Sequence, residues 1–443
     1  MLGHYRIAGR RAVEIVASVE RGVGEGALAP GQPLPPMREL AQELGVNPNT
    51  VAAAYRALRD RGVVETAGRR GTRVRPAPAT TARGALLIDA PEGVRDLGRG
   101  NPDPALLPPL AGALAETARW SDERPGLYGE EPVDPEFGRL ARASLTADGV
   151  PDGPPAVTSG ALDATERVLM AHLRPGDAVA LEDPGWDRLL DLVPALGLRP
   201  VPVALDDEGP LPDAVARALR GGARALLVTC RAQNPTGAAV SRARAAELRR
   251  LLARYPDTLV VEDDNGHGFV DLAPHPLAGA TTHWAFVRSL AKAYGPDLRV
   301  AALAGDPVTV DRLLGRQRLG PGWVSRLLQR TVVRLWETEA LDARAVAASY
   351  GERREGLIAA LAERGVRAHG RCGMNVWVPV ADETGAVARL AQAGWAVAPG
   401  ARFRQAAGPG MRLTVSDLAL PDIAPLADAV AAATAPVAPR SHG

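Results

Sequence analysis

A single lysine, Lys292, stands among 51 arginines in this chain. Where the chain needs only positive charge it uses arginine, so the retained lysine suggests a chemical requirement. A lysine amine can lose its proton and form an imine with an aldehyde, whereas a guanidinium stays protonated. Chance survival of one lysine is the competing explanation, and the residues around Lys292 must decide between the two.

The segment RSLAKAYGPDLR, residues 288–299, places a hydroxyl and a guanidinium near that amine. Ser289 lies three residues before Lys292 and Arg299 seven residues after it. These three groups could meet at one phosphate-bearing aldehyde. Ser159-Gly160-Ala161 precedes an expected helix at 161–173, whose first backbone N–H groups can bind a phosphate. Each motif is a weak signal alone.

Other candidate side chains follow expected strands. The apolar run 259–261 leads into Glu262-Asp263-Asp264, where a carboxylate could hold a ring nitrogen protonated or could simply cap a solvated helix. Asn234 opens an Asn-Pro-Thr-Gly turn, and its amide could reach a phenolic oxygen or serve the turn alone. Trp186 could stack on a flat ring or belong to the core. Arg412, on an expected strand, suits a carboxylate clamp.

The elements that must position these residues alternate between short apolar runs and amphipathic stretches. Expected buried strands are 178–181, 225–229 and 259–262, and expected helices are 161–173, 187–196, 212–220 and 241–255. This alternation predicts an α/β fold with a mostly parallel, doubly wound sheet. Ligands of such sheets bind at the carboxyl ends of the strands, where the candidate residues fall.

Residues 1–75 form a basic segment, with 12 Arg against 7 Asp and Glu, whereas the rest of the chain is slightly acidic. Helices are expected at 5–23, 37–44 and from Asn47 to about Arg61, followed by a basic hairpin over 62–76. Asn47 suits an N-cap and Pro48 the first helical position. Two short helices joined by a tight turn indicate a helix-turn-helix with a wing. A three-helix interaction module remains the alternative.

Residues 34–74, LPPMRELAQELGVNPNTVAAAYRALRDRGVVETAGRRGTRV, resemble the winged helix of the GntR family of bacterial regulators. The resemblance implies that the matching residues lie at the surface of double-stranded DNA, in a promoter operator. Those residues are Arg38, Asn47, Asn49, Thr50, Arg56, Arg70 and Thr72. We expect phosphate contacts from Arg38, Thr50 and Arg70, and base-edge contacts from Asn49 and Arg56.

From about residue 100 to 433 the chain resembles the fold-type I, class I/II aminotransferases. The motifs GNPDP, SGA, DPGW, NPTG, EDD, SLAKAYGPDLR and MRLTV occur in that family's order. The resemblance implies the cofactor pyridoxal 5′-phosphate, with an internal aldimine at Lys292 and Asp263 paired with the ring nitrogen. It implies further that Asn234 bonds the ring hydroxyl and Trp186 stacks on the ring. The implied phosphate ligands are Ser159, Gly160, Ala161, Ser289 and Arg299, and Arg412 would bind the substrate carboxylate.

One departure from the family bears on catalysis. The tyrosine usual two or three residues after the aspartate is replaced by Asn265 and Gly266, with His267 nearby. Without that phenol the proton handling of the site should differ, which argues against efficient transamination. Cofactor binding is not affected by this argument, because the lysine, the aspartate and the phosphate ligands are all present.

A GntR winged helix joined to an aminotransferase-like body resembles the layout of the MocR-type regulators. We expect a winged helix-turn-helix domain at 1–75, a linker at 76–95 and a cofactor-binding domain at 96–436 that ends in a small α+β subdomain. The resemblance implies a homodimeric transcription factor that senses the cofactor, or a small amino or carboxylate compound, at Lys292. A working aminotransferase and a sensor without covalent exchange are the alternatives.

The remaining composition favours a cytoplasmic protein without a metal. Only two cysteines occur, Cys230 and Cys372, and they lack metal-ligand spacing. The first residues contain no uninterrupted apolar stretch, and no run of about 18 apolar residues is present, so neither a secretion signal nor a membrane span is expected.

Overall fold

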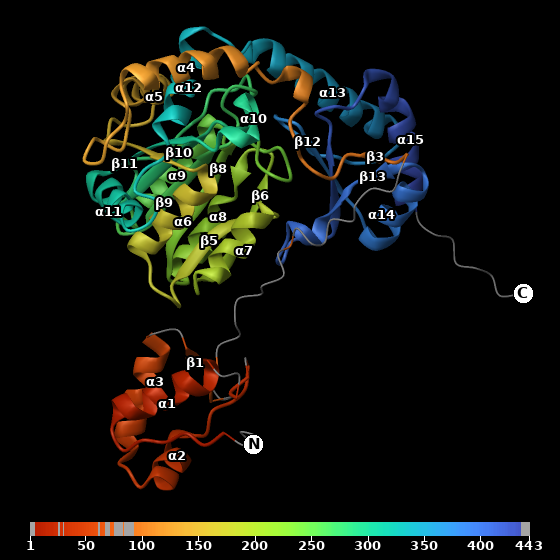
Figure 1. The fold of residues 1–443 in the computed structure, drawn as a ribbon. Coiled ribbons are helices and arrows are strands. Elements are labelled where there is room, and N and C mark those ends of the chain that lie inside the picture. The colour runs from red at the N-terminus through yellow and green to blue at the C-terminus, as the bar shows by residue number, and fades with distance from the viewer. Residues whose placement is uncertain are drawn as a thin grey trace, which may run out of the picture. The chain divides into compact units, whose positions relative to one another are not determined.

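The computed structural model describes residues 5–24, 27–29, 31–60, 63–66, 71–74, 83 and 93–435. Its chain divides into two compact units (Figure 1). One comprises Met1–Thr81 with two short segments, Arg174–Asp177 and Val193–Arg199, and the other comprises the rest. Most of the expected linker, including residues 76–82 and 84–92, lies outside the described residues.

The N-terminal part contains three helices and a hairpin. These are α1 (Ala12–Gly24), α2 (Met37–Leu44), α3 (Pro48–Asp60), and the antiparallel pair β1 (Val64–Thr66) and β2 (Thr72–Val74). Gly45 ends α2 in a left-handed conformation, with φ 63°, which glycine adopts without strain. Asn47 then accepts a hydrogen bond from the Asn49 N–H at 2.8 Å, so the expected N-cap begins α3. Helix, turn, helix and hairpin follow in the expected order.

The first helix differs from the expected range of 5–23, because α1 begins only at Ala12. The carboxylate of Glu14 accepts hydrogen bonds from the N–H groups of Arg10, at 2.9 Å, and Arg11, at 3.2 Å. These bonds satisfy donors at the start of the helix and fix its first turn there. The apolar spacing extends further upstream because Ile7, which is also buried, packs into the same core without being helical.

An eight-stranded sheet forms the centre of the large part, in the order β4-β11-β10-β9-β8-β5-β6-β7 (Figure 1). The strands are β4 (Pro155–Thr158), β5 (Ala178–Asp183), β6 (Arg199–Asp206), β7 (Gly209–Pro210), β8 (Ala223–Arg231), β9 (Leu259–Asp264), β10 (Trp284–Ser289) and β11 (Ala301–Gly305). The central neighbours β5, β8, β9 and β10 run parallel, whereas β11 is antiparallel to both β10 and β4. The sheet is therefore mixed and mostly parallel, as the sequence predicts.

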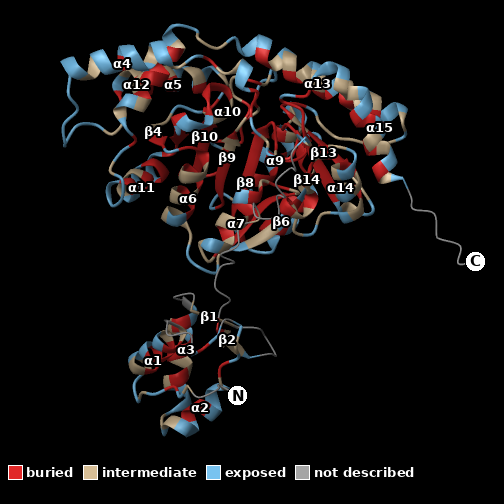
Figure 2. Ribbon diagram, turned by 45° about the vertical axis from the view of Figure 1, so that its right-hand side comes forward, coloured by how far each residue is buried: buried red, intermediate tan, exposed pale blue. Residues whose placement is uncertain are grey.

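Helices connect and cover these strands. They are α4 (Ala111–Glu123), α5 (Pro135–Ala147), α6 (Ala161–His172), α7 (Asp187–Ala195), α8 (Pro212–Arg220), α9 (Arg242–Leu252), α10 (Ala291–Tyr294), α11 (Pro307–Arg318) and α12 (Arg326–Glu337). Helix α6 packs on β9, β10 and β11, and α8 packs on β5 and β8. Strands β5, β10 and β11 are buried along their whole length, whereas α4 shows an exposed face (Figure 2).

A smaller α+β part completes the body. Strands β12 (Asn375–Pro379), β15 (Gly410–Thr414) and β14 (Ala398–Pro399) form one sheet, and β13 (Trp395–Ala396) pairs with β3 (Arg95–Asp96). Helices α13 (Ala343–Glu363), α14 (Glu383–Gln392) and α15 (Ile423–Thr434) share a core with these strands. Because β3 precedes the large sheet in sequence, the small part is built from both ends of the body. Among the described residues, no helix has the length and apolar character needed to cross a membrane.

Candidate functional site

The candidate residues divide between two cavities at the carboxyl ends of β8 and β9. Trp186 and Asp263 line the first cavity. Lys292, Asn234 and Arg412 line the second. Strand β8 contributes Thr229 to the first cavity, and Ala232, the residue directly after β8, lines the second.

Asp263 is the chemically least satisfied group of the first cavity. Its Oδ1 is buried and has no hydrogen-bond partner among the described residues. Burial, together with the nearby charges of Asp264 and Glu182, raises the pKa of Asp263 to about 7. A buried acceptor left without a donor is costly. A cationic ring N–H bound beside Trp186 would supply the missing donor and the missing charge.

Lys292 lies on α10, directly after β10 ends. Its Nζ donates a hydrogen bond to the Gly100 carbonyl oxygen at 2.6 Å. Burial, with added repulsion from Arg412 and Arg188, lowers the pKa of Lys292 to about 8. A substantial fraction of this amine is therefore neutral near pH 8, which is the form that attacks an aldehyde carbon.

Arg412 stands in the middle of β15 and is only 3% exposed. Its Nη1 donates to Asn234 Oδ1 at 3.0 Å and its Nη2 donates to the Gly98 carbonyl oxygen. Its Nε is buried and has no partner within the residues that the structure describes. These acceptors are uncharged, so the guanidinium keeps its full charge inside the cavity. Burial and the neighbouring Arg402 lower the pKa of Arg412 to about 10. A carboxylate ligand would accept a hydrogen bond from Nε and would balance the buried positive charge of Arg412.

A third group, suited to a phosphate, lies at the start of α6. Arg299 Nη2 donates to the Ser159 carbonyl oxygen at 2.7 Å. Gly160 has φ 96°, and a Cβ there would lie 2.5 Å from the same guanidinium nitrogen, so a side chain is excluded. The register of three adjacent strands sets Ser289 opposite Ala301, and Ala301 opposite Thr158, which brings the end of β10 to this edge. The structure therefore gathers the predicted phosphate ligands at one edge of the sheet.

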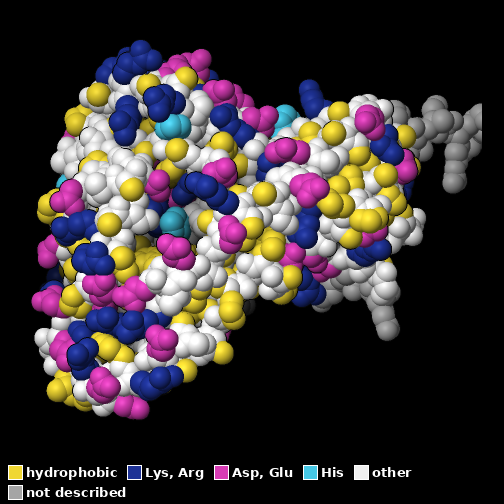
Figure 3. Space-filling view, turned by 90° about the horizontal axis from the view of Figure 1, so that it is seen from above, with side chains coloured by type: hydrophobic (Ala, Val, Ile, Leu, Met, Phe, Trp, Pro, Cys, Tyr) yellow, Lys and Arg dark blue, Asp and Glu magenta, His cyan; other side chains and the backbone are white. Residues whose placement is uncertain are grey.

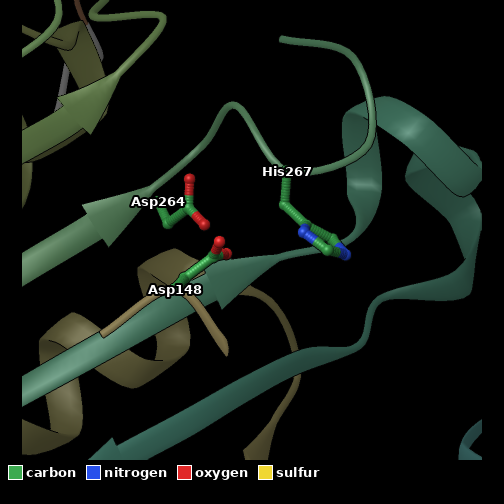
Figure 4. Close-up of side chains that lie close together, drawn as sticks. All are labelled: Asp148, Asp264 and His267. Carbon is green, nitrogen blue, oxygen red and sulfur yellow. The ribbon is translucent and has the colours of Figure 1, made fainter. Parts of the chain in front are cut away.

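The position of the usual tyrosine is filled by a short amide. Asn265 lines the lysine cavity, and its Nδ2 lies 3.4 Å from the Ala232 carbonyl oxygen. His267 faces Asp148 and Asp264 (Figure 4). Burial and the charge of Arg288 lower the pKa of His267 to about 3, which leaves it neutral. His267 is not among the residues that line the lysine cavity, so it does not take the place of the phenol there.

Sequence reasoning missed Glu182, which precedes the last residue of the fully buried strand β5. Glu182 accepts hydrogen bonds from the Thr229 N–H at 3.1 Å, the Thr229 hydroxyl at 2.9 Å and Gln233 Nε2 at 3.2 Å. Burial raises the pKa of Glu182 to about 7. Its place at a strand end, directly before the predicted Asp-Pro-Gly-Trp motif, is the signal that could have identified it.

The described candidate DNA-contacting residues lie on α2, on α3 and the turn before it, and on β2 of the hairpin. Arg38, Asn47, Asn49 and Arg56 are exposed, and Thr50 and Thr72 are half-buried. Arg70 lies outside the described residues. The helices are held by an apolar core of fully buried side chains that includes Leu40, Val51 and Leu58. On the body, by contrast, basic and acidic side chains are interspersed over the face shown in Figure 3.

Comparisons with known proteins define the class. Residues 96–430 match the model of the aminotransferase class I and II family, and residues 11–74 match that of the bacterial regulatory proteins of the gntR family. The fold resembles Pyrococcus horikoshii kynurenine aminotransferase, with a TM-score of 0.69 and 20% identity over 80% of this chain and 96% of that one.

Two curated transcriptional regulators are similar to this chain. The vitamin B6 salvage pathway transcriptional repressor PtsJ of Salmonella typhimurium is 40% identical over 421 residues, which cover 93% of this chain and 96% of the relative. The pyridoxine biosynthesis transcriptional regulator PdxR of Corynebacterium glutamicum is 30% identical over 57% of this chain and 55% of its own length. The chain belongs to the MocR-type transcriptional regulators, in which a GntR helix-turn-helix is fused to an aminotransferase class I/II domain.

Proposed function

We propose that this regulator binds operator DNA through residues 1–75 and pyridoxal 5′-phosphate at Lys292. Its DNA binding then responds to the cofactor, or to an amino compound that reacts with it. The names of PtsJ and PdxR support control of vitamin B6 supply as the regulated process. By the same family argument the active form is a homodimer, whose two heads read two half-sites.

The observation that carries the proposal is the buried Oδ1 of Asp263, which has no partner in the described part of the chain, in the cavity lined by Trp186. A pyridinium N–H fits that acceptor, the indole offers a stacking surface, and the group around Gly160 and Arg299 offers backbone N–H and guanidinium donors for a phosphate. The residues present therefore fit this cofactor. When bound, it supplies an aldehyde carbon that amines attack and a ring that withdraws electrons.

Lys292, Asn234 and Arg412 have separate roles in the proposed sensing. The ammonium group of Lys292 loses its proton near pH 8. Its neutral amine then attacks the cofactor aldehyde in competition with free amines of similar pKa. Asn234 is held toward Arg412 by their 3.0 Å hydrogen bond, so a carboxylate that binds Arg412 also reorients an amide beside the ring site. This arrangement favours an effector that carries both an amine and a carboxylate.

A working aminotransferase is the second candidate, supported by the presence of Lys292, Asp263 and Arg412 together. The small amide of Asn265 counts against it, because Nδ2 cannot replace a phenol in proton handling. The two candidates differ in one measurable respect. An aminotransferase converts amino acids with repeated turnover, whereas a sensor undergoes at most a stoichiometric change.

The proposal is tested by mobility shift on DNA upstream of the chain's own gene and its neighbours. The full-length protein is compared with and without pyridoxal 5′-phosphate, beside Lys292→Ala and the matched surface variant Arg217→Ala. We expect specific binding that the cofactor changes at least fivefold, and a change below twofold in Lys292→Ala. Absence of specific binding to all of these fragments, together with amino acid turnover, would support the enzyme instead.

A further inference from the structure

Arg83, within the expected linker, is held against the body by a carboxylate and two carbonyl groups. Its N–H donates to Asp191 Oδ2 at 2.8 Å, and its Nε lies 3.4 Å from Asp191 Oδ1. Its Nη1 donates to the carbonyl oxygens of Ala401 and Arg404, at 3.2 Å each. Four polar contacts on one half-buried arginine define a docking site for the linker, formed by α7 and residues 400–404. We call residues 400–404 the linker turn.

The same two elements also form a wall beside Arg412. Arg402, in the short helix η5 (Gly400–Arg402), donates from Nη2 to Asp187 Oδ2 at 2.7 Å. The guanidinium carbons of Arg402 and Arg412 lie 5.2 and 4.8 Å from the centre of the Phe403 ring. Asp187 and Asp191 are four residues apart on α7 and so project from one side of it. One carboxylate holds the turn through Arg402, and the other holds the linker.

This wall also contains buried guanidinium N–H donors that have no acceptor among the described residues. Arg402 is 8% exposed, and both its Nε and its Nη1 are buried without a partner among the described residues. Arg412 Nε is in the same condition. Buried donors without acceptors oppose the folded arrangement, and an anionic ligand that supplies acceptors removes that cost. The charge of Arg402 also lowers the pKa of Arg412, so the two guanidinium groups interact electrostatically.

We propose that Asp191 and the linker turn form a docking site for Arg83, and that an anionic ligand at Arg412 changes the strength of this docking through Arg402 and Phe403. The ligand class is a carboxylate or phosphate small molecule. This inference rests on the proposed function, because docking matters to regulation only if the head binds DNA. It goes beyond that function by naming the contact through which the body controls the head.

The physical effect of docking is on the length of the tether. Val74 ends β2, and Arg83 follows nine residues later. Nine residues can span at most about 30 Å. If Arg83 is released, the next anchor described downstream is the Arg95 N–H bond to the Gly394 carbonyl oxygen, 21 residues after Val74. That length spans at most about 70 Å. Docking thus more than halves the reach of the head and sets the effective concentration of a second head near its half-site.

Docking itself is tested by trypsin cleavage after Arg83 in the full-length protein, followed by mass spectrometry of the peptides. Asp191→Asn leaves the cleavage site intact and removes the charge that holds it, and Asp213→Asn on α8 is the matched control. We expect cleavage after Arg83 to accelerate at least fivefold in Asp191→Asn and to stay within twofold of wild type in the control. Equal rates in all three proteins would overturn the docking site, whatever the protein does on DNA.

Coupling is tested by measuring the Kd for operator DNA in the presence of pyridoxal 5′-phosphate, with and without maleate as the carboxylate probe, in wild type, Arg83→Ala, Asp191→Asn and Arg217→Ala. We expect a maleate-induced change in Kd of at least fivefold in wild type and in Arg217→Ala, and below twofold in the other two. Cofactor affinity, read from its absorption, should stay within twofold throughout. A wild-type response to maleate in Arg83→Ala, or no response in a wild type that still binds the operator specifically, contradicts the coupling, whereas absence of specific operator binding contradicts the proposed function instead.

Discussion

The two sides of β9 treat neighbouring carboxylates in opposite ways. On one side Asp264 is fully buried and bonded to Arg231 Nε at 2.7 Å and to Arg288 Nε at 3.0 Å. On the cavity side Asp263 is left with a buried oxygen that has no partner among the described residues. The carboxylate of Asp264 is bonded by side chains of the fold, whereas the carboxylate of Asp263 lacks a hydrogen-bond donor that a ligand could supply. Polar satisfaction, rather than burial or residue type, distinguishes structure from site.

The largest expected effect is the loss of folding stability on substitution of Asp264. Asp264→Ala leaves the buried guanidinium groups of Arg231 and Arg288 with Asp148 as their one remaining carboxylate partner among the described residues. Breaking such an ion-pair cluster costs about 3–5 kcal/mol of folding free energy. Urea unfolding of the purified protein, followed by tryptophan fluorescence, measures the loss. The matched variant Asp263→Ala is expected to cost far less without cofactor. Equal losses in the two variants would abolish the distinction between the two sides of β9.

The cavity side should respond in ligand binding. Asp263→Asn removes the charge that a ring N–H would meet, and we expect affinity for pyridoxal 5′-phosphate to fall on the order of 100-fold, or about 2.7 kcal/mol. Absorbance titration gives the constant, with Asp213→Asn as control. An affinity within twofold of wild type would mean that Asp263 does not face the ring nitrogen.

The same substitution should affect the cofactor-free protein with the opposite sign. The raised pKa of Asp263, about 7, means that the folded chain binds more protons than the unfolded chain between about pH 4 and pH 7. Folding stability contributed by this group therefore falls as pH rises through that window. Asp263→Asn should stabilise the protein relative to wild type at pH 8 but not at pH 4. Thermal unfolding at the two pH values measures the difference.

A smaller effect is expected in the kinetics of cofactor attachment at Lys292. Because the pKa of Lys292 is lowered to about 8, the neutral fraction of the amine rises roughly fivefold from pH 7 to pH 8 and less than twofold from pH 8 to pH 9. Stopped-flow absorbance should show the attachment rate following this curve. A rate that continues to climb tenfold per pH unit above pH 9 would indicate an unperturbed amine.

The smallest expected effect is the loss of folding stability on substitution of Thr229, which lines the first cavity. Thr229→Val removes the hydroxyl that donates to Glu182 Oε2 at 2.9 Å but keeps the shape of the side chain. Because two other donors to Glu182 remain, we expect a loss of about 1 kcal/mol in urea unfolding. A loss above 3 kcal/mol would show that this hydroxyl supports the entire buried acid.

Local sequence patterns were enough to predict the buried strands, but they did not predict which side chains contact each other. Strands β5, β8 and β9 contain the three expected apolar runs, because buried parallel strands are nearly all apolar. The adjacent Asp263 and Asp264 could not be told apart by environment, since the partners of Asp264 are far along the chain. Arg402 and Asp187 are 215 residues apart. No periodicity in the sequence pairs residues at that separation.

The single lysine has a practical consequence for chemical footprinting. Reagents that acylate amines ordinarily decorate a protein surface at many positions, but this chain offers one ε-amine besides its own amino terminus. That amine lies in a cavity, bonded to the Gly100 carbonyl oxygen. Once the amino terminus is accounted for, the extent of acylation at Lys292 reports the occupancy of one pocket, as one additional mass increment on the intact protein, without any engineered label.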